Sequence, residues 1–320
     1  MTRPAPQLSA PPRTVRTWLP LALVGPTASG KTEASVALAP RLDAEILVVD
    51  SMTVYRGMDV GTAKPTPADR GAVRHHLVDL AAPTDAFSVA AFQRLARVAL
   101  LSIAGRGRTP LLVGGSGLYF RAVVDDLSFP GTDRSVRQEL EAESRALGPE
   151  RLHARLGAFD PDAAGRIDPG NSRRTVRALE VVAITGRPFS EFRRGWDRYP
   201  SDRVRAAGVE VEPEALRRRI DARVRRMLEG GLIDEVRALR ARGSGRFLTA
   251  SQAIGYLEVA EHLDGRLDAQ EMERRIARRT RELARRQMAW FRRDPRVRWF
   301  EAGEGGAGEV VDEIEEYLRG

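Results

Sequence analysis

The sequence contains no cysteine, which excludes disulfide bonds and thiolate metal sites and is typical of proteins from the reducing cytoplasm. It also lacks any apolar run close to the ~20 residues that a membrane-spanning helix needs. We therefore expect a cytoplasmic protein that has no membrane partner.

Lysine is nearly absent as well. Lys31 and Lys64 are the only lysines among 52 Lys and Arg residues, so arginine carries almost all of the positive charge. Lys is a compact charge on a flexible stem, whereas Arg is a rigid planar fork. A chain that uses lysine so rarely is expected to need its shape where it occurs, although for Lys64 the sequence leaves open that it has no special role.

Positive charge is in excess over the chain as a whole. The formal net charge of the 320 residues is +8, which favours polyanions as partners. The positive charge is concentrated in four arginine-rich segments: Arg173 to Arg177, Arg193 to Arg198, Arg217 to Arg226 and Arg274 to Arg298. With 42% hydrophobic and 30% charged residues the chain is otherwise an ordinary globular one. Only residues 1–16, with four prolines and no apolar core, predict a disordered tail.

A phosphate-binding motif lies near the start of the chain. The apolar run Leu19 to Val24 ends in Gly25-Pro26-Thr27-Ala28-Ser29-Gly30-Lys31-Thr32, which matches G-x-x-x-x-G-K-[ST] at every defined position. Its glycines allow backbone N–H groups to point inward at phosphate oxygens where a helix begins. Lys31 adds a mobile cation, and Thr32 offers a hydroxyl to Mg²⁺. A chance glycine-rich turn is the alternative, but the flanking strand and the helix-forming segment 33–39 favour a phosphate loop.

The following segments alternate between strand and helix. Glu45 to Asp50 is a continuous apolar run typical of a buried strand, and Ser88 caps a helix that ends at Gly105. A further strand, Pro110 to Val113, leads into the glycine turn before Ser116. Such alternation predicts a parallel sheet, in which the loops at the carboxyl ends of the strands share one edge. The phosphate loop, Asp50 and Ser116 should therefore converge.

The character of the chain changes near Leu127. Residues 128–200 contain no convincing strand and are expected to form an all-helical insertion domain, whose helices span Asp133 to Leu156 and Asn171 to Thr185. The α/β pattern resumes at a strand from Val204 to Val211. The expected later elements are helices at Pro213 to Gly230, Ile233 to Ala241, Ser251 to Leu263, Asp268 to Arg292 and Glu309 to Leu318, and a strand at Val297 to Phe300. We expect an α/β fold with a P-loop NTPase-like core, formed by residues 17–127 and 201–320, around the insertion.

The motif by itself leaves the reaction open. Asp50 closes a strand beside the loop and could be either a carboxylate near Mg²⁺ or a general base. The basic helices favour a nucleic-acid substrate, and aromatics such as Trp290 and Tyr256 could stack on bases or simply be buried. A kinase of a small metabolite would explain the loop without needing the basic helices. A non-catalytic RNA-binding protein would leave the loop unused.

Several further stretches together carry a family resemblance. They are Asp50-Ser51, Tyr55 to Pro65 (Tyr-Arg-Gly-Met-Asp-Val-Gly-Thr-Ala-Lys-Pro), His75 to Asp79, Leu112 to Tyr119, Arg177 to Glu180, Gln252 to Tyr256 and Thr280 to Gln287. With the phosphate loop they resemble the tRNA dimethylallyltransferases, also called tRNA isopentenyltransferases, in order from about Leu21 to Trp299. The segment Gly-Met-Asp-Val-Gly-Thr-Ala-Lys-Pro is specific to that family.

The resemblance implies a reaction and a set of roles. A dimethylallyl group would pass from dimethylallyl diphosphate to N6 of adenosine 37, in tRNAs that read codons beginning with U, with Mg²⁺ as cofactor. The phosphate loop would hold the diphosphate, the insertion would clamp the anticodon stem-loop, and the enzyme would be a monomer. A relative that prenylates free adenine nucleotides is a further alternative, but a small acceptor needs no clamp.

The resemblance also assigns residues. The catalytic residues would be Asp50 as general base, Thr27 and Arg223, and the metal ligand would be Thr32. The tRNA-binding residues would be Asp50, Ser51, Met52, Thr53, Ser116, Arg173, Arg174, Arg177, Gln252, Gly255 and Tyr256. Two positions depart from the family pattern: Leu257 stands where a basic residue is common, and Ser116 where Thr is common.

Overall fold

The computed structural model describes residues 19–125, 127–193, 195–242 and 253–320. Its core is a six-stranded sheet in which every neighbouring pair of strands is parallel, with the order β3-β2-β4-β1-β5-β6. The strands are β1 (Leu21–Val24), β2 (Ala44–Val48), β3 (His75–His76), β4 (Thr109–Gly114), β5 (Arg205–Val211) and β6 (Val297–Ala302). The predicted α/β fold with a parallel sheet is confirmed.

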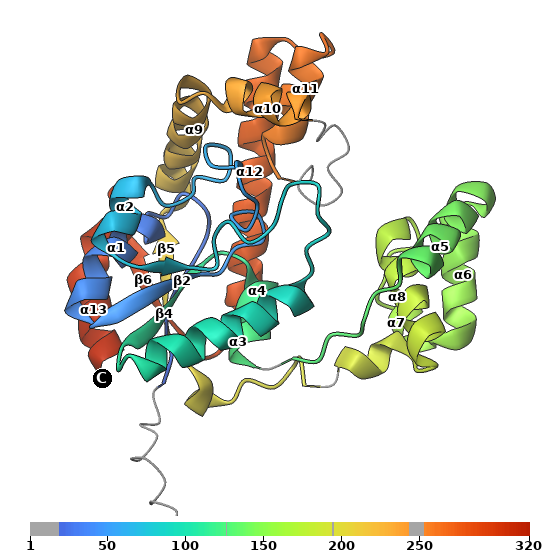
Figure 1. Cartoon of the computed structure of the whole chain (residues 1–320), viewed down its shortest axis with the longest axis horizontal. Helices are drawn as coiled ribbons and strands as arrows, with labels where there is room; N and C mark the ends of the chain where they lie inside the picture. The colour runs from blue at the N-terminus through green and yellow to red at the C-terminus, as the bar shows by residue number, and fades with distance from the viewer. Residues whose placement is uncertain (1–18, 126, 194, 243–252) are drawn as a thin grey trace, which may run out of the picture.

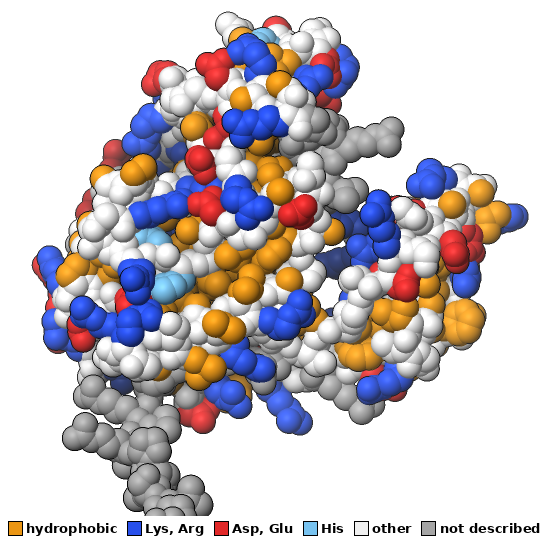
Figure 2. All heavy atoms as spheres, in the orientation of Figure 1, with side chains coloured by type: hydrophobic (Ala, Val, Ile, Leu, Met, Phe, Trp, Pro, Cys, Tyr) orange, Lys and Arg blue, Asp and Glu red, His pale blue; other side chains and the backbone are white. Residues whose placement is uncertain are grey.

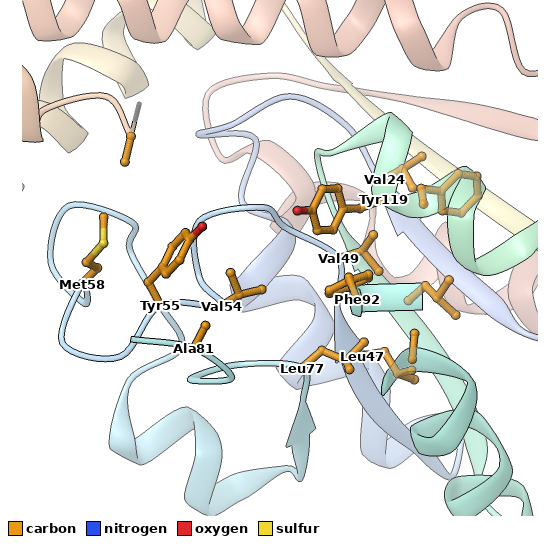
Figure 3. Close-up of a cluster of buried hydrophobic side chains, with 14 of the residues drawn as sticks. Val24, Leu47, Val49, Val54, Tyr55, Met58, Leu77, Ala81, Phe92 and Tyr119 are labelled. Atoms are coloured by element: carbon orange, nitrogen blue, oxygen red, sulfur yellow. The ribbon is translucent and has the colours of Figure 1, made fainter. Parts of the chain in front are cut away.

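The two faces of the sheet bury separate apolar clusters because successive strand residues point to opposite sides. Leu23 and Ile46 contribute to the cluster beneath α1 (Lys31–Arg41) and α13 (Val311–Arg319). On the other face, residues such as Leu47 and Leu112 pack with helical side chains. On that face packs α3 (Val89–Gly105), and the same apolar cluster continues through α4 (Gly117–Val124), α9 (Pro213–Glu229), α10 (Leu232–Ala241), α11 (Tyr256–Leu263) and α12 (Ala269–Phe291). Figure 3 shows part of this second cluster, in which Phe92 of α3 packs among strand side chains.

A second unit of helices stands to one side of the core (Figure 1). It comprises α5 (Arg134–Leu147), α6 (Pro149–Phe159), α7 (Pro161–Ala164) and α8 (Ser172–Thr185). Its apolar side chains form their own cluster, made of Leu140, Leu152, Leu156, Ala163, Ile167, Val176, Ala178 and Leu179. A separate core lets these helices hold together without packing on the sheet.

One expected helix is two. The segment Asp133 to Leu156 was expected to be continuous, but α5 ends at Leu147 and α6 begins at Pro149. Gly148 between them has φ +87° and ψ 158°, a conformation that glycine adopts readily and that interrupts the helix, and Pro149 has no N–H to continue the preceding one.

The remaining elements are short, and some expectations fall outside the described residues. The short helices are α2 (Pro67–Ala72), η1 (Phe189–Arg193), η2 (Ser201–Arg203) and η4 (Gly306–Val310). The expected tail, residues 1–16, and the start of the expected helix at Ser251 lie outside the described part of the chain, as does Gln252. None of the helices described here is both long and apolar enough to cross a bilayer.

Candidate functional site

Three loops meet at the carboxyl edge of the sheet, where β2, β4 and β1 are neighbours. The phosphate loop follows β1, Asp50 follows β2, and the turn before Ser116 follows β4. A Cβ built on Gly115 would lie only 3.1 Å from the carbonyl oxygen of Gly25, so the first and third loops are in contact. The second loop lies beside them, because Val49, which precedes Asp50, donates its N–H to the carbonyl oxygen of Val113 at 2.8 Å. The structure thus brings together the segments that the sequence predicted to converge.

Lys31 is buried within the phosphate loop, at the start of α1. Its ammonium group donates to Ser29 Oγ at 3.1 Å and to the carbonyl oxygen of Pro26. Burial, and to a smaller extent the positive charge of Arg223, lower the pKa of Lys31 to about 7, whereas Asp50 acts in the opposite direction. An anion bound in the loop would oppose both lowering effects and favour the charged ammonium.

Arg223 approaches the same place from α9. Burial lowers the pKa of its guanidinium group, and the negative charge of Asp50 counteracts that effect. Lys31, Arg223 and Asp50 therefore form one electrostatic group, although they come from three different elements. Two partly desolvated cations beside the phosphate loop are suited to bind a compact, highly charged anion.

Asp50 is oriented by its own backbone. Its Oδ1 accepts hydrogen bonds from the N–H of Met52 at 2.7 Å and of Thr53 at 3.2 Å. Among the described residues its Oδ2 accepts no hydrogen bond. The carboxylate is thus fixed by one oxygen, and the other remains available to take a proton, which is the arrangement that a general base requires. Ser51 and Met52 are partly exposed, and Thr53 is buried.

Figure 3 shows two tyrosines of this region, with the hydroxyl groups of Tyr55 and Tyr119 directed toward one another. Burial raises the pKa of Tyr119 well above its ordinary value, and the neighbouring Tyr55 and Asp50 add to the effect. The Tyr119 hydroxyl therefore stays protonated and can act only as a neutral hydrogen-bonding group near Asp50.

Gln287 is a site residue for which sequence reasoning predicts no role. It lies on α12, and its Oε1 accepts a hydrogen bond of 2.7 Å from the N–H of Thr27. A Cβ on Gly115 would lie 2.3 Å from Gln287 Nε2, so the same amide also fills the space beside the third loop. Its only sequence signal is its position in the Thr280 to Gln287 stretch that carries the family resemblance.

Tyr256 does not present itself to RNA in this structure. Its side chain is 3% exposed, and its O–H donates to Glu235 Oε1 at 2.6 Å. Glu235 also accepts the backbone N–H groups of Asp59 at 2.7 Å and Val60 at 2.8 Å. Of the two possibilities that the sequence leaves open for Tyr256, stacking on a base and burial, the structure shows burial, and its hydroxyl fixes the carboxylate that holds the loop after Gly57. Its neighbour Gly255 is buried too.

Lys64 has a structural use for its compact charge. Its side chain is 2% exposed, and the ammonium group pairs with Asp59 Oδ1 at 2.6 Å and Asp79 Oδ1 at 2.7 Å. It also donates to the carbonyl oxygen of Tyr55. Three acceptors around one buried point match the three N–H bonds of an ammonium group.

The three arginines of α8 differ in their surroundings. Arg173 and Arg174 are exposed at the first turn of the helix, and Figure 2 shows Lys and Arg side chains where this unit faces the core. Arg177 instead donates to the carbonyl oxygens of Pro130 at 2.8 Å and Gly131 at 2.9 Å. It also pairs with the fully buried carboxylate of Glu180 at 2.7 Å. The structure therefore uses Arg177 to fix the chain entering the helical unit, rather than to offer a charge to phosphates.

The site offers a magnesium ion one protein ligand, the hydroxyl group of Thr32. Thr32 is exposed at the start of α1, and the described residues contain no cluster of three His, Asp or Glu side chains that could hold a metal. Mg²⁺ commonly takes few protein ligands and completes its shell with phosphate oxygens and water. The residues present are consistent with an ion that enters together with a phosphate group, with Thr32 as its protein ligand.

Comparisons with known proteins identify the family to which the sequence is similar. The sequence model of the IPP transferase family matches residues 53–294. A tRNA dimethylallyltransferase of Salinispora arenicola is 51% identical over 294 residues, which cover 92% of this chain and 85% of the relative. One of Streptomyces coelicolor is 51% identical over 284 residues, which cover 88% of this chain and 90% of the relative.

A solved structure agrees as well. The tRNA isopentenylpyrophosphate transferase of Bacillus halodurans superposes with a TM-score of 0.68 at 42% identity, covering 94% of this chain and 95% of that one. The chain therefore belongs to the IPP transferase family, in which these relatives are tRNA dimethylallyltransferases.

Proposed function

We propose that the chain transfers a dimethylallyl group from dimethylallyl diphosphate to N6 of adenosine 37 in the anticodon stem-loop of tRNAs that read codons beginning with U. The observation that carries the proposal is the grouping of Lys31, Arg223 and Asp50 at one edge of the sheet. An anion site stands there directly beside a carboxylate. A leaving diphosphate and a nucleophile that must lose a proton require these two features side by side.

The anion site would act on the leaving group. As the allylic C–O bond breaks, negative charge develops on the diphosphate, and donors already in place stabilise that charge most effectively. The loop N–H groups, Thr27, Lys31 and Arg223 would supply these donors. When bound at Thr32 with the diphosphate, Mg²⁺ would supply further neutralisation of its charge.

Asp50 would act on the nucleophile. The N6 amine of adenine is a poor nucleophile because its lone pair is delocalised into the ring. As the new bond forms between N6 and the allylic carbon, the amine loses one proton, and Oδ2 of Asp50 would take it. The electron pair of the broken C–O bond leaves with the diphosphate, so charge and atoms balance.

The helical unit would serve the acceptor. Adenosine 37 must leave its stack to reach the sheet edge, at a cost that is smaller in a loop than in a duplex. Contacts between RNA phosphates and Arg173 and Arg174 would offset that cost. The three groups assigned to the reaction lie in one chain, and we propose that a monomer in the cytoplasm is the working form. Light scattering at assay concentration tests the monomer.

The test is incubation of the purified protein with labelled dimethylallyl diphosphate and three acceptors. These are an unmodified tRNA with adenosine at position 37, the same tRNA with guanosine there, and AMP. Label should enter only the first. Label in AMP would identify an enzyme acting on free nucleotides, and equal labelling of both tRNAs would overturn the assignment of the acceptor atom.

A further inference from the structure

Two carbonyl groups of the phosphate loop are held by distant parts of the chain. The Ala28 carbonyl oxygen accepts a 2.7 Å hydrogen bond from Arg219 Nε, and the Ser29 carbonyl oxygen accepts one of 2.7 Å from the N–H of Ala307. A trans peptide directs its C=O and its N–H to opposite sides, and the described residues contain no cis peptide. Holding these carbonyls therefore turns the N–H groups of Ser29 and Gly30 away from Arg219 and Ala307.

That opposite side is the inner side of the loop. The N–H of Ser29 points to the carbonyl oxygen of Pro26 at 3.3 Å, and the same oxygen accepts from the buried ammonium group of Lys31. The Ser29 amide that Arg219 orients therefore lies on the same side of the loop as the Lys31 ammonium group, because both donate to one oxygen.

The loop needs such external support at Ala28. This residue has φ +65°, a left-handed conformation that a residue with a Cβ adopts only at an energetic cost. The hydrogen bond from Arg219 is made to this residue's own carbonyl group. It stabilises the loop at the point where the loop is most strained.

The segment that supplies the second hydrogen bond is itself shaped for close approach. Gly306 has φ +62°, and a Cβ on it would lie 2.7 Å from the Ser29 carbonyl oxygen. Glu309 accepts the N–H groups of Gly303 and Gly305 at 2.6 Å each. Arg219 joins the two supports, because its NH1 nitrogen donates to the Glu304 carbonyl oxygen at 2.7 Å.

We propose that Arg219 and residues 303–310 are positioning elements for the diphosphate: they fix the direction of the loop amides without touching the substrate. Residues 303–310 lie beyond the stretch matched by the family, residues 53–294. The inference rests on the proposed function, in which the loop holds the diphosphate. It gives Arg219 a role different from that of Arg223, one helical turn away, which faces Lys31 and Asp50.

The test compares pyrophosphate binding and steady-state kinetics in Arg219→Ala, Arg219→Lys and a matched control. The control is Arg218→Ala, because Arg218 is the neighbouring arginine and pairs on the surface with the side chain of Glu304. Arg219→Ala should weaken pyrophosphate binding and raise KM for dimethylallyl diphosphate about tenfold, while KM for tRNA and kcat stay within about twofold. Arg219→Lys, which can keep one hydrogen bond but not both, should lie between. Arg218→Ala should match the unmodified protein.

Unchanged pyrophosphate affinity in Arg219→Ala would overturn the inference. A lowered Tm with an unchanged KM for dimethylallyl diphosphate would overturn it too, because that result is expected if Arg219 only stabilises the fold. If Arg219→Ala does not fold, Gly306→Ala tests the same support, because its Cβ would press on the Ser29 carbonyl group. It should raise KM for the donor, and an unchanged KM would overturn the inference. Lys31→Ala distinguishes a failure of the proposed function from a failure of this inference. If Lys31→Ala binds pyrophosphate normally, the proposed diphosphate site is wrong. If Lys31→Ala loses pyrophosphate binding but Arg219→Ala keeps it, only the positioning role is refuted.

Discussion

The phosphate loop and the first turn of α8 are both candidate anion sites, and they are built in opposite ways. In the loop, the cation Lys31 is buried. Residues of α9 and η4 donate hydrogen bonds to two carbonyl groups of the loop, and a side chain of α12 accepts one from the N–H of Thr27. On α8, Arg173 and Arg174 are exposed at one helix end, on a unit with its own small core. A compact diphosphate whose charge changes during reaction requires fixed donors, whereas an RNA backbone can be held by charges spread over a surface.

The comparison predicts the largest effect for a change in the enclosed site. Asp50→Asn should lower turnover on the order of 10²-fold or more, because an amide cannot take the proton from N6. The Asn Oδ1 can still accept the backbone N–H groups of Met52 and Thr53, so the local fold should persist. Single-turnover transfer of labelled dimethylallyl groups measures the loss. Pyrophosphate and tRNA binding, measured in parallel, separate it from weaker binding, and near-normal turnover would remove Asp50 as the base.

A smaller effect is expected from the exposed site. The double reversal Arg173→Glu, Arg174→Glu should weaken tRNA binding about tenfold and reduce the slope of log K against log salt by about two, because two phosphate contacts are lost. Pyrophosphate binding should not change. The matched control is Arg145→Glu, Arg151→Glu, which alters exposed arginines elsewhere on the same unit by the same charge. Equal weakening in both variants would show that general charge, rather than the α8 turn, attracts the RNA.

Tyr256→Phe probes a side chain that the structure shows to be buried. Removing the hydroxyl takes one hydrogen bond from Glu235 and should lower the free energy of unfolding by about 1 kcal/mol. Affinity for tRNA should not change. Denaturant titration measures the first quantity and filter binding the second. A variant as stable as the unmodified protein would contradict the buried contact.

The smallest expected effect is the uptake of a proton by Lys31 when pyrophosphate binds. In the free protein Lys31 has a pKa of about 7, so at pH 8 most molecules hold it neutral. A bound anion raises that pKa, so binding at pH 8 should take up close to one proton at Lys31, and binding below pH 6 almost none. Calorimetry of pyrophosphate binding in buffers of different ionisation enthalpy measures the uptake. Lys31→Arg, which keeps a positive charge that does not titrate in this pH range, corrects for protons taken up by pyrophosphate itself, and the same uptake in that variant would refute the assignment to Lys31.

Much of the fold could be predicted because its signals are local. Strands β1, β2 and β4 are short, mainly apolar runs at whose ends a glycine or an aspartate stands. Helices such as α8 and α12 begin directly after Asn171 and Asp268, whose side chains cap them. The break at Gly148 was missed because the charged residues on either side continue a helical pattern. A glycine followed by proline is a stop signal that should outweigh such a pattern.

Side-chain roles were harder to predict where they depend on burial. Tyr256 and Arg177 were expected to contact RNA because aromatic and basic residues suit RNA. In the structure Tyr256 is buried, and Arg177 is tied to a buried carboxylate and two carbonyl groups. The type of a residue determines which partners its side chain can bind. The surroundings of the side chain in the folded protein determine whether it can reach such a partner.

The phosphate loop and the parallel sheet that presents it can be predicted from the sequence alone, because eight consecutive residues and their flanking strand and helix specify that geometry locally. The residues that surround the loop are brought there only by folding. Arg219 reaches Ala28 across 191 residues of sequence, and Gln287 reaches Thr27 across 260. Contacts at such separation leave no periodic or local pattern in the chain, since they exist only once the helices have packed on the sheet.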